Sequence, residues 1–284
     1  MMTQRRVVVL LAAAVVVIGG AVWVSSQRHL DRDTTAGQPV LEGLKAALND
    51  VTEIRVTKGD GTHATLRKRP TDWAVVERSY PADSGKVRKL LLDLGALEVV
   101  EEKTRDPANF ARIGVDEVNS PKATGTRVEA VTPKKVYGLI VGNTSGSKSV
   151  YVRAAGAQQS LLATPGVTAD SDPKRWLDHT LVDIPEARIK EVALAPAGST
   201  AYTVSREKKE QTDFTVSNIP KGRELSSPGA GNPMAGDLAS VTLDDVRSSA
   251  TAPAATAPAD RVTFRTFDGL ELQVDGRKEG DHHF

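Results

Sequence analysis

The stretch that most constrains this chain is an uninterrupted apolar run of eighteen residues from Val7 to Val24. A run of this length, without a charge, is at the lower limit of what crosses the roughly 30 Å hydrocarbon core of a bilayer as an α-helix. Arg5 and Arg6 come immediately before it, and such basic residues mark the cytoplasmic side of a membrane segment. We therefore expect a cytoplasmic tip at 1–6, a transmembrane helix at 7–24 and a body outside the cytoplasm.

A cleaved signal peptide is the alternative interpretation of the same run. The apolar core of a signal peptide usually has about 7–15 residues and ends at a cleavage site between small residues. Here the core is longer, and Val22, Trp23 and Val24 fill the position where cleavage is expected. Retention as an anchor is therefore the favoured prediction. A lipoprotein is excluded because the chain has no cysteine to acylate.

The charge balance excludes several classes of function. Lys and Arg number 37 and Asp and Glu number 36, mixed along the whole chain, so the sequence offers no basic stripe for nucleic acid. The absence of cysteine removes disulfides, zinc–thiolate sites and thiol nucleophiles. None of the five histidines stands at ligand spacing on a predicted helix. We expect no metal and no cofactor.

After the anchor, residues 25–40 are polar and aperiodic, which is typical of a juxtamembrane tether. A first module is predicted at 41–185. Its opening pattern predicts a short helix through Leu44, then strands around Ile54 and Leu66 joined by a hairpin turn at Asp60-Gly61, and a third strand at Trp73.

The rest of the first module predicts one helix and a meander. The helix is capped by Asp83 or Ser84, carries the apolar stripe Val87, Leu90, Leu91 and Leu94, and ends at Gly95. Alternating residues from 126 to 162 then predict four antiparallel strands.

A second module is predicted at 186–284 because the pattern begins again. Strands at Ile189, Tyr202 and Phe214 match those of the first module, and 262–276 matches 128–142 in length and alternation. A duplicated unit of about 135–140 residues is indicated. The second copy is expected to have a poorer helix from Leu238 to Val246, a low-complexity insert at 248–260, and an incomplete C-terminus. The predicted fold class is α+β, mainly antiparallel sheets with packed helices, in two related modules after one N-terminal transmembrane helix.

Motifs that resemble catalytic or phosphate-binding sites do not have the required context. Residues 142–148 lack the GxxxxGK[ST] pattern and join two predicted strands, so they predict a hairpin loop. Ser145 and Lys148 have the spacing of a serine–lysine nucleophile, but that chemistry needs both on one helical turn. The acidic residues after the first helix are scattered and predict a solvated edge. No catalytic residue is predicted.

The remaining site hypothesis concerns aromatic residues. Trp73 and Phe214 occupy matching positions in the two modules, which favours a role in the core. Trp176 is flanked by charged residues, so it either caps the core or faces a partner or ligand, together with Arg175 and His179.

The sequence resembles the DUF4340 family of bacterial membrane-anchored envelope proteins from about Leu41 onward. The resemblance is carried by the strands at Ile54 and Trp73, the helix after Asp83, and the stretches Phe110 to Asp116, Leu139 to Gly142, Tyr151 to Arg153 and Trp176 to Asp178. A Tyr-Gly-Leu-Asp-like stretch is usual where this chain has Arg112 to Asp116. The resemblance implies no catalytic residues, a bacterial inner-membrane protein with its body in the periplasm, and an accessory role beside the permease or auxiliary subunits of a gliding-type ABC transporter.

Three functions follow as hypotheses. The first is a non-enzymatic extracytoplasmic accessory or scaffold protein that docks through sheet edges and module faces. The second is a glycan- or peptidoglycan-binding envelope protein that uses Trp176 or Trp73. The third, an envelope hydrolase, requires a buried carboxylate pair or a Ser/His contact.

Overall fold

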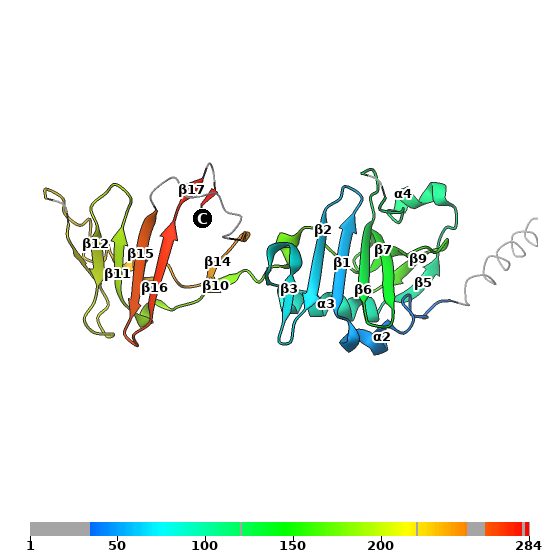
Figure 1. The fold of residues 1–284 in the computed structure, drawn as a ribbon, viewed down its shortest axis with the longest axis horizontal. Coiled ribbons are helices and arrows are strands. Elements are labelled where there is room, and N and C mark those ends of the chain that lie inside the picture. Colours follow the sequence, from blue (N-terminus) through cyan, green and yellow to red (C-terminus); the bar gives the residue numbers. More distant parts are fainter. Residues whose placement is uncertain (1–34, 120, 220, 249–258, 280–281, 284) are drawn as a thin grey trace, which may run out of the picture. The chain divides into compact units, whose positions relative to one another are not determined.

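The computed structural model describes residues 35–119, 121–219, 221–248, 259–279 and 282–283 (Figure 1). Outside these residues lie the predicted tip at 1–6, the segment Val7–Val24, most of the tether, and residues 249–258 of the predicted insert. Within them, no helix is both long enough and apolar enough to cross a membrane. Contacts divide the chain into unit 1, which ends at Leu177, and unit 2, which begins at Asp178, whereas the sequence places the module boundary after residue 185.

Unit 1 is built on a nine-stranded antiparallel sheet in the order β4-β3-β2-β1-β6-β7-β8-β9-β5. The strands are β1 Glu53–Lys58, β2 His63–Lys68, β3 Trp73–Val75, β4 Tyr80–Pro81, β5 Glu98–Glu102, β6 Thr126–Val131, β7 Val136–Ser145, β8 Ser149–Ala154 and β9 Ser160–Thr164. The predicted hairpins and the four-strand meander are all present. Burial alternates along the strands, so that Ile54 and Val56 of β1 are buried whereas Arg55 between them is exposed.

One long helix and several short ones accompany this sheet. They are α2 Leu44–Ala47, η1 Leu48–Asp50, η2 Val76–Arg78, α3 Ser84–Gly95, η3 Pro107–Asn109, α4 Phe110–Ile113 and η4 Pro173–Trp176. Helix α3 lies across one face of the sheet (Figure 1). Its predicted stripe, Val87, Leu90, Leu91 and Leu94, is buried, so the apolar faces of helix and sheet form the core of unit 1.

Helix α3 begins and ends where the sequence predicts. Asp83 is the N-cap, because its Oδ1 accepts hydrogen bonds from the backbone N–H groups of Gly85 and Lys86. Gly95 is the last helical residue, as predicted, and Ala96 is the C-cap. A Cβ at Gly95 would lie 3.0 Å from Leu48 Cδ1, so the glycine allows η1 to approach α3 closely.

The last residues of the predicted tether belong to the folded unit. Gly37 N–H donates to Val99 O at 2.8 Å, Val99 N–H donates to Gln38 O at 2.9 Å, and Pro39 bridges to Glu98. Residues 37–40 therefore lie along the outer edge of β5. The sequence did not predict this pairing because a segment with a proline and a glycine has no strand periodicity.

Unit 2 contains a five-stranded antiparallel sheet in the order β13-β12-β11-β15-β16, together with two small two-stranded sheets. Its elements are β10 Thr180–Val182, η5 Glu186–Arg188, β11 Ile189–Ala195, β12 Tyr202–Ser205, β13 Thr215–Ser217, α5 Asn232–Ala235, β14 Val241–Thr242, β15 Asp260–Thr266, β16 Glu271–Gly276, β17 Lys278–Glu279 and β18 His282–His283. The predicted helix from Leu238 to Val246 is wrong. Val241 and Thr242 form β14, which pairs with β10, and the β-branched residues there suit a strand.

The sheet of unit 2 repeats the order of part of the sheet in unit 1, β3-β2-β1-β6-β7. The registers also agree. Ile54 of β1 pairs with Leu66 and Ala130, and Val192 of β11 pairs with Val204 and Phe264. These are the strand correspondences that the sequence predicts.

The described fold is therefore mainly antiparallel sheet, as predicted, with few helices. The helix α3 of 12 residues is the longest one that the structure describes.

Candidate functional site

A pocket of about 340 Å³ in unit 1 contains two of the three predicted site residues. Its wall combines part of α3 with the segment 166–176 near the end of the unit. The lining residues are Lys86, Lys89, Leu90 and Asp93 from α3, and Gly166, Thr168, Asp170, Arg175 and Trp176 from the segment. We call this the Trp176 pocket.

Local hydrogen bonds explain why the segment takes this shape. Asp172 caps η4 by accepting from the N–H of Lys174 at 3.0 Å, and a proline occupies the first turn. The Trp176 indole Nε1–H donates to Asp170 O at 2.7 Å. Asp83 N–H, at the start of α3, donates to Trp176 O at 2.8 Å. The segment is therefore fixed both to itself and to α3.

Trp176 caps the core and does not present an open ring. Only 5% of its surface is exposed, and its one polar atom already has a hydrogen-bond partner. A sugar that stacks on an aromatic residue needs a free ring face. Trp176 therefore serves as a wall of the pocket, whereas the neighbouring Arg175 is an exposed rim residue.

The charged side chains at the rim are paired. Lys86 Nζ donates to Arg175 O at 3.0 Å and lies 3.7 Å from Asp83 Oδ2. Lys89 pairs with Asp93 one helical turn later, and Arg175 Nε lies 3.9 Å from Asp170 Oδ2. Each cation of this pocket thus has a nearby carboxylate, and the rim has no strong preference for an anionic ligand.

The polar groups of the pocket lining are mainly charged side chains. Asp93 and Asp170 are each engaged by a cation, and the lining contains no histidine or serine that would act as base or nucleophile. Among the residues that the structure describes, no three His, Asp or Glu side chains are arranged to hold a metal ion.

His179 belongs to unit 2 and is occupied there. Its Nδ1 lies 2.6 Å from Leu243 O, and Leu243 N–H donates to His179 O at 2.9 Å. These contacts hold residue 243 beside β10. The structure therefore places Trp176 and Arg175 at one pocket, while His179 has a local role in the other unit.

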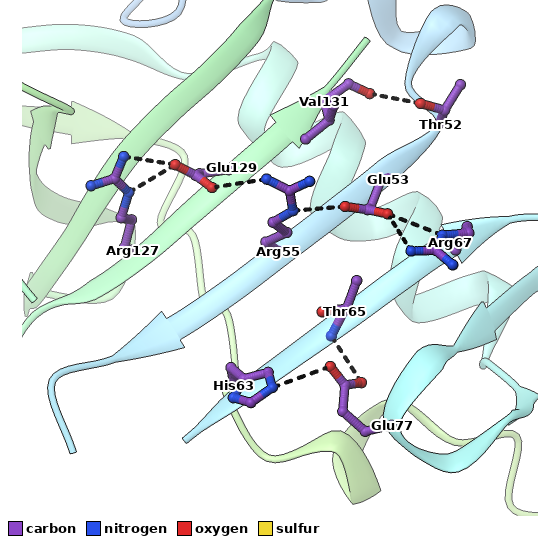
Figure 2. A network of polar contacts seen from close by, with 10 residues as sticks. All are labelled: Thr52, Glu53, Arg55, His63, Thr65, Arg67, Glu77, Arg127, Glu129 and Val131. Atoms are coloured by element: carbon purple, nitrogen blue, oxygen red, sulfur yellow. Dashed lines mark hydrogen bonds and ion pairs between the residues drawn. The ribbon is translucent and has the colours of Figure 1, made fainter. Parts of the chain in front are cut away.

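A polar network that the sequence analysis did not single out covers the other face of the sheet in unit 1 (Figure 2). Its five charges alternate in sign across β6, β1 and β2, in the order Arg127, Glu129, Arg55, Glu53, Arg67. We call this the charge ladder. Its signal in the sequence is the alternation of charged and apolar residues along the strands, but the ladder also requires the register between strands.

The pKa of Glu53, one of the two carboxylates of the ladder, is shifted by its neighbours. Burial raises the pKa of Glu53, but the hydrogen bonds from Arg67 and Arg55 bring the pKa below its usual value. At the edge of the same face, Glu77 accepts a hydrogen bond from Thr65 N–H at 3.0 Å and lies 3.8 Å from His63 Nε2 (Figure 2). With each charge beside one of the opposite sign, this face is suited to contact with water.

The sequence model of the family described as "Domain of unknown function (DUF4340)" matches residues 73–261. This chain belongs to the DUF4340 family. The DUF4340 match begins at β3 and reaches into β15, so it includes parts of both units. It contains the Trp176 pocket but not β1 and β2, which carry part of the charge ladder. No curated protein and no solved structure matches the chain.

Proposed function

We propose that this DUF4340 protein is a non-enzymatic accessory protein, anchored in the bacterial inner membrane by residues 7–24, that binds a partner protein outside the cytoplasm. The observation that carries the proposal is the open edge of β16. In unit 1, β8 pairs with β7. Among the described residues, no strand pairs with the outer side of β16, the counterpart of β7 in unit 2.

The edge also exposes apolar side chains. Leu270, just before β16, and Val274 within it are each 43% exposed. An open strand with exposed apolar residues is a template for strand addition by another chain. The occupant we propose is an extended segment of a membrane partner, with apolar and polar residues alternating as in β8. The partner that the family resemblance favours is a permease or auxiliary subunit of an ABC transporter.

The proposal that the protein is not an enzyme is supported by the ion pairs of its carboxylates. The carboxylates of the Trp176 pocket and of the charge ladder are held by cations. The Ser145 and Lys148 side chains belong to the β7–β8 hairpin and do not share a helix. General acid–base or nucleophilic chemistry needs a positioned group that is free to react.

We also infer that the two units are related α+β modules that arose by duplication. The agreement of strand order and register over five strands supports this inference. In unit 1 the shared sheet is covered by α3, and the described part of unit 2 has only the four-residue α5.

The test is co-purification of the tagged full-length protein from its native membrane in mild detergent, with identification of bound proteins by mass spectrometry. The edge variant is Val274→Lys, which places a charge on β16. The matched control is Val136→Lys, because Val136 is 50% exposed on β7, whose two sides are both paired.

An ABC transporter subunit that is enriched with the wild type and the control, but lost with Val274→Lys, would support the proposal. Recovery of the protein alone, under conditions that keep a control complex intact, would contradict it. The mass of the purified chain tests the anchor separately, because signal-peptide cleavage removes N-terminal residues and gives a lighter chain than retention does.

A glycan ligand in the Trp176 pocket is the alternative function, and the size of the cavity is the observation that favours it. Because Trp176 is buried, the exposed Arg175 is the better residue to change. Loss of muropeptide binding in Arg175→Ala, with binding retained in Lys122→Ala, would favour this alternative. If the wild-type protein does not bind muropeptide, the glycan-binding alternative is wrong.

A further inference from the structure

A second pocket in unit 1, of about 580 Å³, lies where three segments meet. Helix α2 with η1 contributes Lys45 and Leu48, the β2–β3 turn contributes Lys68 through Trp73, and α3 contributes Arg88 and Leu92. We call it the Trp73 pocket. It contains none of the residues of the Trp176 pocket.

The charges of the Trp73 pocket are unbalanced. Lys45, Lys68, Arg69 and Arg88 line it, and Asp72 is the one carboxylate in the lining. Arg69 donates two hydrogen bonds of 2.6 Å to Asp72. Those hydrogen bonds hold the pKa of Asp72 below its usual value, so this pair stays ionised and matched.

Three cations are then left without a carboxylate. Lys68 Nζ donates to the backbone O of Asn49 at 2.8 Å, which holds the ammonium group beside the pocket. The side chains of Lys45 and Arg88 make no hydrogen bond or ion pair with any residue in the described part of the chain. This differs from the Trp176 pocket and the charge ladder, where carboxylates lie beside the cations.

The same pocket presents apolar surface next to these cations. Trp73 is half-buried. Leu92 is 55% exposed, which with Leu181 is the largest exposed fraction among the large apolar residues that the structure describes. Cations beside an exposed leucine and a tryptophan form the pattern that binds at the boundary between lipid headgroups and acyl chains.

We propose that the Trp73 pocket binds the phosphate of an anionic phospholipid headgroup, with Lys45, Lys68 and Arg88 around the phosphate and Leu92 and Trp73 toward the acyl chains. This inference rests on the proposed membrane anchor. The cations supply charge complementarity to the phosphodiester, and the apolar side chains distinguish a lipid from a soluble anion.

The length of the tether allows this contact. Residue 37 is already held on β5, so the linker between the proposed transmembrane helix and unit 1 is 25–36. A fully extended linker of that length spans at most roughly 40 Å, at about 3.4 Å per residue. Unit 1 therefore stays within about one domain diameter of the bilayer, where a weak headgroup site acts at high local concentration.

The absence of cysteine makes a site-specific test direct. Ala96→Cys places a fluorophore at the exposed C-cap of α3, one turn beyond Leu92 and outside the pocket lining. The full-length chain is reconstituted in nanodiscs of phosphatidylcholine, or of an equal mixture with phosphatidylglycerol, each with a nitroxide-labelled lipid as quencher. Ser147→Cys, in the exposed β7–β8 turn, is the control reporter position.

We expect stronger quenching at residue 96 in the anionic discs than in the neutral discs. Arg88→Glu is expected to lower the ratio of docked to undocked protein by about fivefold or more. Lys122→Glu, which makes the same charge change at an exposed residue outside the pocket, should leave the ratio unchanged.

Equal quenching in the two lipids, or quenching that Arg88→Glu does not alter, would overturn the proposal. Glycerol phosphate added to the neutral discs tests whether the pocket binds a soluble phosphate. A change in fluorescence that depends on Arg88 but does not involve the nitroxide-labelled lipid would show a site for soluble phosphate in place of a lipid site. Co-elution of the chain with neutral discs reports the anchor alone. Val274→Lys, which tests the partner edge, should leave the quenching unchanged, so failure of either proposal can be distinguished.

Discussion

Glu53 accepts two hydrogen bonds from Arg67, the residue directly opposite it on the neighbouring strand β2. The Nε and Nη2 atoms of Arg67 lie 3.0 and 2.9 Å from Glu53 Oε2, while Arg55 donates to the other oxygen at 2.7 Å. The carboxylate side chain is 13% exposed. This arrangement makes the ionised form of Glu53 part of the stability of unit 1.

The first prediction concerns the pH dependence of that contribution. Because the pKa of Glu53 is lowered in the folded chain, its contribution is complete above the unfolded pKa near 4.5 and is lost as the pH falls through the folded pKa. Glu53→Gln should cost about 1 kcal/mol at neutral pH. The difference from wild type should shrink below pH 4.5. Urea unfolding at several pH values measures it, with the exposed Glu98→Gln as the control.

The second prediction concerns Arg206, a buried cation of unit 2. Its guanidinium donates to the backbone oxygens of Ile189, Gln211 and Glu186 at 2.8–3.1 Å and lies 4.5 Å from the centre of the Phe214 ring. Arg206→Met should cost about 2–4 kcal/mol, because three carbonyl groups lose their donor.

Hydrogen exchange on the full chain should locate the loss of protection in β11, β12 and β15. The control is Lys209→Met, an exposed residue near Phe267, for which a change within about 0.5 kcal/mol is expected. If the two variants lower the free energy of unfolding equally, the buried contacts of Arg206 do not stabilise unit 2.

The third prediction tests the close contact of β7 with the end of α4. A Cβ at Gly142 would clash with the backbone oxygen of Ile113 and lie 2.8 Å from Gly114 O. Since backbone cannot move aside as a side chain can, Gly142→Ala should cost about 1–3 kcal/mol in thermal or urea unfolding. Gly166→Ala, whose nearest neighbour is at 3.7 Å, should be nearly neutral. If neither variant lowers the free energy of unfolding, the end of α4 must move aside at little cost.

The fourth prediction separates structure from binding at the Trp176 pocket. Trp176→Ala removes a buried ring and should cost about 3–5 kcal/mol. Arg175→Ala should change stability by no more than about 0.5 kcal/mol, because its side chain is 73% exposed. Thermal unfolding of both variants checks this. A stable Trp176→Ala variant would show that the ring is not part of the core.

The sequence predicted the elements that have a strong periodic pattern. Helix α3 and the strands around Ile54 and Leu66 follow from their apolar spacing, because one face of each must be buried. The helix predicted from Leu238 failed because a few apolar residues at helical spacing are a weak signal, and pairing of β14 with β10 determines that region. Burial of Trp176 could not be predicted from its charged neighbours, since η4 directs the ring inward and Arg175 outward.

The Trp73 pocket could not be predicted from the sequence because its residues come from separate segments. Lys45, Lys68 and Arg88 are far apart in the sequence and meet only because α2 and the β2–β3 turn both lie beside α3. Charges that are balanced over the whole chain can still be unbalanced locally. A net charge near zero thus excludes a continuous basic stripe but does not exclude one small anion site.

The charge ladder also bears on how a chain with two similar sheets avoids exchanging strands between them. In the native pairing Arg55 faces Glu129, whereas the corresponding pair in unit 2 is Ala193 and Thr263. If β11 took the place of β1 beside β6, Ala193 would face Glu129, which would keep Arg127 but lose its contact with Arg55. Because β11 has Glu191 where β1 has Glu53, the exchange would remove only the central cation, and Arg55 is the residue of the ladder that favours β1 as the neighbour of β6.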